Sequence, residues 1–162
     1  MKIETMQLDA NAWVPNNPHL PVRVYRSAIE VTGEQGAERF EMLFTDNGWR
    51  PDWRDGVYDY HHYHSTAHEA LGVFAGTAVL ELGGPDGEQI IVTAGDAVML
   101  PAGTGHRCLE ASDDFQVVGA YPRGQDWDIC RSADDGALAR IAALPDPAQD
   151  PITGAWGAAL SA

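Results

Sequence analysis

Hydrophobic and polar positions alternate in short runs through the middle of the chain. Between Gly56 and Tyr121, seven runs rich in β-branched and aromatic residues are separated by turn-forming residues. This spacing is typical of an all-β barrel or sandwich. Tight turns are predicted at 83–87, where the sequence is GGPDG, and at 102–105, where it is AGTG. The seven runs are VYDYHHYH, EALGVFA, TAVLEL, EQIIVT, DAVMLP, HRCLE and FQVVGAY.

The regions on either side of these runs have other patterns. The run PVRVYRSAI at 21–29 follows a proline-containing arm and predicts a strand. A helix is predicted next, capped by Thr32 and ending near 47–48. A further short helix is predicted within ADDGALARIAAL, after Pro122, followed by a tail with prolines. The apolar stripe of the first helix consists of Ala37, Phe40, Leu43 and Phe44.

The length of 162 residues, with 44% hydrophobic residues, suits one domain with a single core. We expect the barrel core at about 50–122, an N-terminal arm, strand and helix at 1–49, and a C-terminal extension at 123–162. The start MKIETMQLDA lacks the pattern of a signal peptide, and no apolar run approaches the roughly 18 residues of a membrane helix. Two cysteines are too few for a disulfide framework. A soluble, cytoplasmic protein is predicted.

The formal charge of −14 excludes two classes of partner. An excess of acids repels phosphate backbones and anionic membrane surfaces, so we expect neither nucleic acid nor membrane as a partner. Lys2 is the only lysine and lies at the start of the chain, which leaves Schiff-base chemistry almost without a candidate residue.

Five of the six histidines lie within 61–68 or at 106. In a strand, residues two apart point to the same side, so His62 and His64 would present two imidazoles on one face. By the same alternation His61 and Tyr63 would face away. Two imidazoles on one face of a strand can chelate a metal ion.

Two later residues complete a candidate metal site. Glu69 opens the strand EALGVFA, and His106 follows the turn at 102–105, so a barrel would bring both toward the histidine pair. Three nitrogens and one oxygen suit iron, manganese, nickel or zinc, whereas calcium and magnesium prefer oxygen ligands. An alternative stays open, because a strand starting one residue earlier would turn His68 inward in place of Glu69.

At these residues the sequence resembles the cupin superfamily. Its first motif, G-x5-H-x-H-x4-E-x6-G, is met in full by Gly56, His62, His64, Glu69 and Gly76. The second motif, G-x5-P-x-G-x2-H-x3-N, follows 18 residues later. It is met by Gly95, Pro101, Gly103 and His106, but Glu110 stands where the family usually has asparagine.

The resemblance implies an all-β double-stranded β-helix, the cupin jelly-roll barrel, with one short N-terminal helix and an irregular C-terminal tail. It also implies one bound divalent transition metal and a small-molecule ligand. The stretches PNNPHLPVRVYR, HHYHSTAHEALGVFAG and VVGAYPRGQDWD look like those of small bacterial single-domain cupins that mostly lack an assigned reaction. Similar proteins often form homodimers through an N-terminal strand, for which PVRVYRSAI is the candidate.

Five further residues are candidates for contacts around the ion. Tyr58 and Tyr60 share the alternation of His62 and could line the cavity. Cys108 shares that of His106 and is expected to point inward. His68 is a candidate partner for a ligand. Trp127, in the loop after the last strand, is a candidate for covering the cavity mouth.

Two functions fit this pattern. The first is a metalloenzyme of the dioxygenase, isomerase or decarboxylase type acting on a small organic molecule, with an open coordination position for chemistry. Its catalytic base is not fixed by the sequence; Glu69 and His68 are both candidates. The second is a non-catalytic module that binds a sugar or an organic acid. A polar acid or base beside the ion would favour the enzyme.

Overall fold

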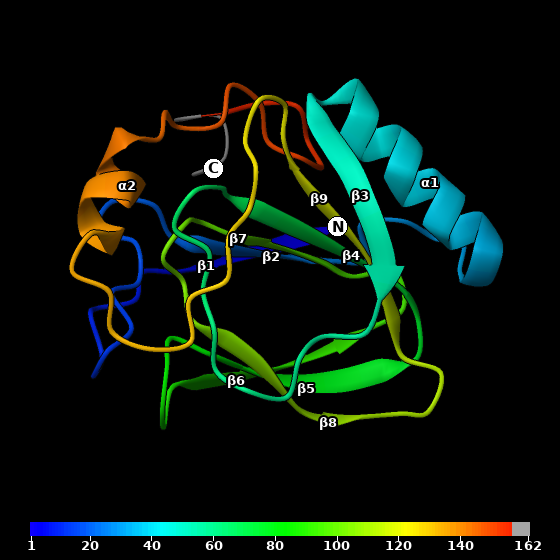
Figure 1. Cartoon of the computed structure of the whole chain (residues 1–162). Helices are drawn as coiled ribbons and strands as arrows, with labels where there is room; N and C mark the ends of the chain where they lie inside the picture. The colour runs from blue at the N-terminus through cyan, green and yellow to red at the C-terminus, as the bar shows by residue number, and fades with distance from the viewer. Residues whose placement is uncertain (157–162) are drawn as a thin grey trace.

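The computed structural model describes residues 1–156 and consists mainly of two antiparallel sheets that face each other (Figure 1). The larger has six strands in the order β1-β2-β7-β4-β9-β3, and the smaller has three in the order β6-β5-β8. This confirms the predicted double-stranded β-helix. The strands are β1 Lys2–Met6, β2 Val22–Arg26, β3 Trp49–Asp55, β4 Glu69–Ala75, β5 Thr77–Leu82, β6 Glu88–Thr93, β7 Ala97–Leu100, β8 His106–Ala111 and β9 Gln116–Pro122; the helices are α1 Gly33–Asp46 and α2 Ala137–Ala143.

The barrel interior is filled by one side of the alternating strand residues. On β4, Leu71 and Val73 point inward, and Leu80 and Leu82 do so from the smaller sheet. Since successive residues of a strand face opposite sides, the same alternation supplies a second apolar face on the outside of the larger sheet. Helix α1 packs there through Phe40 and Phe44, as its apolar stripe predicts (Figure 1).

The N-terminal region contributes two strands to the larger sheet. Only β2 was predicted; β1 was missed, because its run of mixed polarity shows no clean alternation. Strand β2 pairs with β1 on one side and with β7 on the other. The strand within PVRVYRSAI, the candidate for pairing with a second copy, therefore has no free edge, and β1 is the edge of the sheet. Strand β3 at the other edge was also missed, because Pro51 and two arginines interrupt its pattern.

The predicted strand at 57–64 is wrong as well. The segment is extended but irregular, with isolated bridges at His62 and Tyr63 only. Its main-chain hydrogen bonds are spread over two residues of β8, the turn before β8 and the C-terminal extension, so no continuous ladder forms.

The C-terminal extension closes one end of the barrel. Helix α2 packs through Ala137 and Ile141 against Val14 and Tyr63, beside the loop that follows β9 (Figure 1). Further on, the buried Asp150 ties the chain back to β2. The organisation as one domain with the boundaries given above stays a prediction.

No helix within residues 1–156 is both long and apolar enough to cross a bilayer. Cys108 and Cys130 are both free thiols. The cytoplasmic location and the exclusion of nucleic-acid and membrane partners stay predictions.

Candidate metal centre

His62 and His106 are held opposite each other by the main chain. Each donates its amide N–H to the carbonyl of the other, at 3.2 and 2.9 Å, and their ring centroids are 4.0 Å apart. Gly103, with a φ of +91°, allows the sharp turn that leads into His106, a conformation that favours glycine. The Nδ1 atoms lie 3.0 Å and 2.9 Å from the carbonyl oxygens of Tyr60 and Thr104 respectively.

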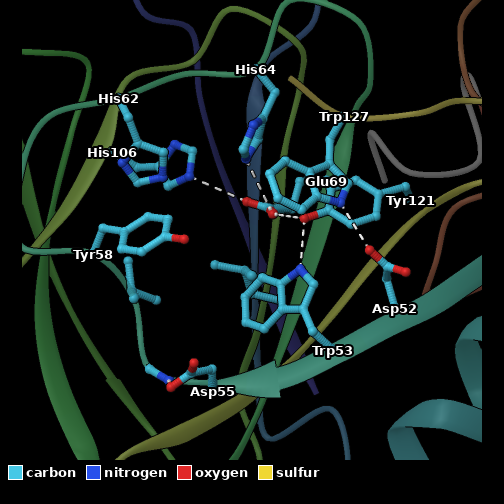
Figure 2. Close-up of a pocket in the computed structure, with 13 residues that line it drawn as sticks. Asp52, Trp53, Asp55, Tyr58, His62, His64, Glu69, His106, Tyr121 and Trp127 are labelled. Carbon is cyan, nitrogen blue, oxygen red and sulfur yellow. Dashed lines mark hydrogen bonds and ion pairs between the residues drawn. The ribbon is translucent and has the colours of Figure 1, made fainter. Parts of the chain in front are cut away.

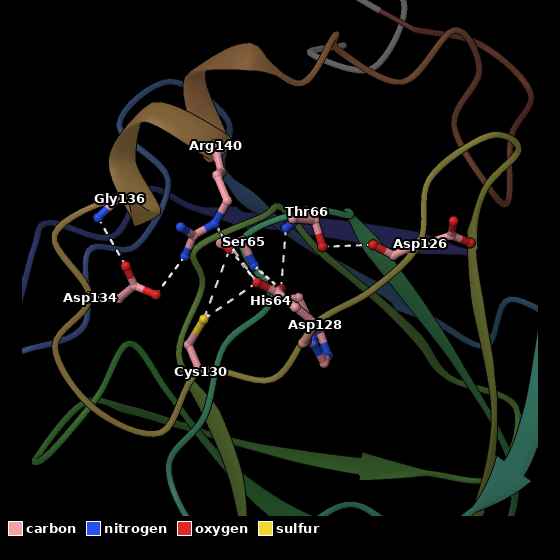
Figure 3. A network of polar contacts seen from close by, with 9 residues as sticks. All are labelled: His64, Ser65, Thr66, Asp126, Asp128, Cys130, Asp134, Gly136 and Arg140. Atoms are coloured by element: carbon pink, nitrogen blue, oxygen red, sulfur yellow. Dashed lines mark hydrogen bonds and ion pairs between the residues drawn. The ribbon is translucent and has the colours of Figure 1, made fainter.

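His64 is positioned by the C-terminal extension (Figure 3). Its Nδ1 faces the main-chain carbonyl of Asp128. The carboxylate of Asp128 in turn accepts the amide N–H of Ser65 at 2.6 Å and the Ser65 hydroxyl. Arg140 of α2 donates to that same hydroxyl at 2.8 Å and pairs with Asp134 at 2.7 Å. The loop after β9 therefore fixes the orientation of the His64 ring.

Glu69 is the first residue of β4 and is fully buried among these rings. Its Oε2 lies 3.3 Å from His64 Nε2, and its Oε1 lies 3.2 Å from His106 Nε2. Because β4 pairs with β9, Tyr121 lies beside it and donates its hydroxyl to Oε2 at 2.6 Å. The indole of Trp53 donates to the Tyr121 oxygen at 2.8 Å, so a row of hydrogen bonds ends on Glu69 (Figure 2).

The three imidazoles share one protonation pattern that suits metal binding. Each Nδ1 faces a carbonyl oxygen, which only accepts hydrogen bonds, so Nδ1 carries the proton. In the neutral rings the Nε2 lone pairs are then free. One ligand nitrogen from each ring lies within 4.8 Å of the others, and all three side chains are buried. Free lone pairs beside a carboxylate repel one another unless a cation lies among them, and this donor set fits a divalent transition metal.

The electrostatics of the cluster depend on Glu69. Burial lowers the pKa of His62 to about 3, and the nearby His106 adds to the effect. Burial also opposes protonation of His64, but the charge and hydrogen bond of Glu69, together with the contacts to Asp128, outweigh it and raise the pKa of His64. Burial would raise the pKa of Glu69, yet His64 and His106 hold it well below its usual range. Without a cation, a protonated His64 therefore balances Glu69.

The cluster forms one wall of a cavity of about 260 Å³ (Figure 2). Asp52 and Trp53 both line it although they are neighbours on β3, because a β-bulge between Pro51 and Trp53 breaks the alternation. Gly119 on β9 makes room for the Trp53 ring, whose Cε2 would lie 2.2 Å from a Cβ there. The full lining is Asp52, Trp53, Asp55, Gly56, Val57, Tyr58, His62, His64, Glu69, Leu71, His106, Tyr121 and Trp127.

Of the five other candidates, two line the cavity. Tyr58 borders it, and Trp127 does so with its ring centroid 5.8 Å from that of His64. Tyr60 stacks on Tyr58, with 4.8 Å between the two ring centroids, and is not part of the cavity lining. Cys108 packs against the barrel core outside the cavity lining.

His68 lies away from the cluster. Its Nδ1 accepts the N–H of Ala102 at 2.9 Å, and its Nε2 lies 3.0 Å from the carbonyl of Pro145. Both ring nitrogens are thus used in joining β4 to the turn before β8 and to the C-terminal extension. The geometry fits neither the alternative in which His68 replaces Glu69 nor a role for His68 as base or as partner of a ligand.

Four residues around the cluster were not predicted from the sequence. Asp52 and Trp53 could not be placed because their strand and its bulge were not predicted. Tyr121 ends the run FQVVGAY, and its pairing with Glu69 depends on which strands are neighbours. Asp128 lies in the stretch GQDWD, where only Trp127 had been singled out.

Comparison with known proteins agrees with this site. Residues 54–118 match the cupin domain family, and this segment contains all four residues of the cluster. The uncharacterized protein YjlB of Bacillus subtilis (strain 168) is 42% identical over 144 residues, which is 87% of this chain and 84% of that protein.

Solved structures with the same type of fold are more distant. A DUF861 family protein from Thermotoga maritima has a TM-score of 0.35 and 20% identity, covering 60% of this chain and 96% of its own. RmlC from Streptococcus suis, solved in complex with dTDP-D-xylose, has a TM-score of 0.40 and 13% identity, covering 75% of this chain and 70% of its own. The family match and the close relative do establish the family: this chain is a small cupin.

Proposed function

We propose that the protein binds one divalent transition metal ion through His62, His64, His106 and Glu69, and that it is a metalloenzyme acting on a small organic molecule. The observation that carries the proposal is the convergence of three buried imidazoles, whose ligand nitrogens lie within 4.8 Å of one another, with two of the rings in contact with the buried carboxylate of Glu69. Main-chain carbonyls hold all three rings in that orientation. An arrangement of this kind has a large electrostatic cost unless a cation is bound.

A bound ion would supply Lewis-acid polarisation of a substrate oxygen, or dioxygen chemistry if the ion is iron. The residues of this chain would do the rest. Tyr121 holds Glu69 in place by donating its hydroxyl to Oε2, with 2.6 Å between the two oxygens. Trp53 and Trp127 line the sides of the cavity. His62, His64, His106 and Glu69 would hold the ion at the wall of this space, and the remaining coordination positions would be left for a small ligand.

Catalysis is favoured over simple binding by the polar group beside the ion site. Tyr121 lies within hydrogen-bond distance of Glu69 and also lines the cavity, so its hydroxyl would lie next to both a bound ion and a bound substrate. A module that only captures a ligand would not need it. A reaction of the dioxygenase, isomerase or decarboxylase type is compatible with these groups.

The test combines metal loading with a search for turnover. Metal-free protein is titrated with Co²⁺, Mn²⁺, Fe²⁺ and Zn²⁺, and the loaded forms are incubated with a bacterial metabolite extract that is followed by mass spectrometry. We expect one ion per chain and depletion of at least one small molecule. The double variant His62→Ala, His106→Ala should show neither. Stoichiometric metal without any depletion would contradict catalysis, and absence of metal would contradict the whole proposal.

We also propose that the protein is a homodimer joined at β1. Within residues 1–156 one side of this strand is unpaired, and an unpaired strand edge is a liability that pairing with a second copy removes. Replacing Thr5 by proline would disturb pairing along this strand; the mass of the particle in light scattering should then fall from two chains to one. A monomeric wild-type protein would contradict the proposal.

A further inference from the structure

The cavity beside the proposed ion site has an unusual charge inventory. Among the described residues that line it there is no lysine and no arginine, while Asp52 and Asp55 both border it. Even with a divalent ion offsetting Glu69, the part of the cavity away from the ion is negative. The net charge of −14 for the whole chain adds to this potential.

The two arginines of β3, the strand that supplies Asp52 and Trp53 to the lining, are committed to other acids. Arg50 pairs with Asp52 at 2.9 Å. Arg54 donates to Glu34 and to Glu41, at 2.9 and 2.7 Å. Neither guanidinium lines the cavity. A carboxylate or phosphate on the far side of a ligand would therefore find no basic side chain to bind it.

Asp55 has no such partner. It is exposed at the cavity rim, and its carboxylate accepts only the N–H of Gly56, at 2.7 Å, among the described residues. Figure 2 places Asp55 at the end of the cavity that is away from the imidazoles. One acid is thus free to pair with a positive group on a ligand.

Aromatic rings line the cavity between the three imidazoles and Asp55. Trp127 stacks on Tyr121 with ring centroids 6.0 Å apart. Trp53 and Tyr58 stand on opposite sides of the cavity in Figure 2. Faces of such rings attract cations, the most strongly for tryptophan.

We propose that the ligand of this cavity is a small organic amine, bound with its ammonium group among the aromatic rings and near Asp55 and with its other end at the ion. The inference rests on the proposed function, since the ion is needed to hold that other end. A volume of about 260 Å³ suits a compact molecule and is too small for a nucleotide sugar.

The test uses three probes of nearly equal shape and different charge. Tyramine carries an ammonium, para-ethylphenol is neutral, and para-hydroxyphenylpropanoate carries a carboxylate. Each is titrated calorimetrically into the metal-loaded protein, after its metal content has been measured. We expect tyramine to bind at least about tenfold more tightly than the carboxylate probe, because a contact between opposite unit charges near a protein surface can contribute this much.

Two variants locate the effect. Asp55→Asn should remove most of the preference for tyramine. Asp113→Asn removes the same charge from the exposed turn between β8 and β9 and should leave the preference unchanged. Equal or tighter binding of the carboxylate probe by fully loaded protein would overturn the inference, as would the absence of binding by all three probes or an unchanged preference in Asp55→Asn. A protein without metal would instead overturn the proposed function.

Discussion

Two buried polar clusters lie at different places in this barrel and are stabilised in different ways. In the first, the Asp150 cluster, the carboxylate pairs with Arg23 at 3.0 Å, accepts the Tyr25 hydroxyl, and accepts two main-chain N–H groups at 2.8 Å. The second is the imidazole cluster, formed by His62, His64, His106 and Glu69. Its acceptor atoms face one another at the wall of the cavity.

The difference separates a structural cluster from a binding site. The Asp150 cluster is complete within the described part of the chain, since every acid oxygen has a donor. The imidazole cluster is complete only if His64 carries a second proton or a cation takes the proton's place. Burying polar groups in incomplete networks is costly, so the second arrangement points to a ligand.

The largest effect is expected when the Asp150 cluster is disrupted by a substitution. Asp150→Asn would leave Arg23 buried without its counter-charge, and we expect a loss of about 3–5 kcal/mol in the free energy of unfolding, measured by urea denaturation of the metal-free protein. Asp146→Asn, at an exposed position nearby, should change it by less than about 0.5 kcal/mol. An equal effect of the two substitutions would show that Arg23 does not depend on Asp150.

The next effect concerns the metal-dependent stability. An ion that binds only the folded state stabilises it by about 4 kcal/mol when its free concentration is about a thousand times Kd. Chelation should therefore lower the melting temperature of the wild type. Glu69→Gln removes the only carboxylate of the imidazole cluster. Chelation should therefore lower the melting temperature of this variant much less than that of the wild type. A wild-type melting temperature that chelation does not change would contradict a well-occupied site.

A smaller effect tests how the C-terminal extension supports His64. Asp128→Ala would release Ser65 and the carbonyl that orients the ring, and groups that orient metal ligands contribute about 10–100-fold in affinity. Competition with a chromogenic chelator measures the loss. Asp126→Ala is the matched control, since its side chain is fully exposed. Equal affinities in the two variants would show that the loop does not position His64.

The smallest effect is the dependence of metal affinity on pH. His64 has a raised pKa, so below that pKa a proton must leave its ring before a metal binds, and affinity should fall by about tenfold per pH unit. His62, with a pKa of about 3, stays neutral and adds nothing between pH 5 and 8. Calorimetry in buffers of different ionisation enthalpy should show release of about one proton per ion at a pH well below the pKa of His64 and of none well above it. An affinity independent of pH below 6.5 would contradict this assignment.

Most of the barrel could be predicted from the sequence because its strands are short, β-branched and bounded by turns. The ranges of β4, β5 and β6 were predicted without error. The edges of the larger sheet were missed because an edge strand exposes one side to solvent and needs no apolar alternation. This holds for β1, none of whose five residues is buried, and for β3, which carries a proline.

The candidate ligands could also be named in advance, since their spacing survives even though 57–64 is not a strand. Isolated bridges still give His62 and His64 a common side. What surrounds them could not be predicted. Tyr121 and Asp128 reach the cluster through strand neighbours and loop contacts far along the chain, and Trp53 and Asp52 through a bulge. Such contacts leave no periodic signal.

The most direct measurement is the metal content of the protein purified without a nickel column. Elemental analysis by mass spectrometry should find one divalent transition ion per chain in the wild type and none in His62→Ala, His106→Ala. Wild-type protein that carries no ion, and that takes up none when iron, manganese, nickel or zinc is added, would contradict the account.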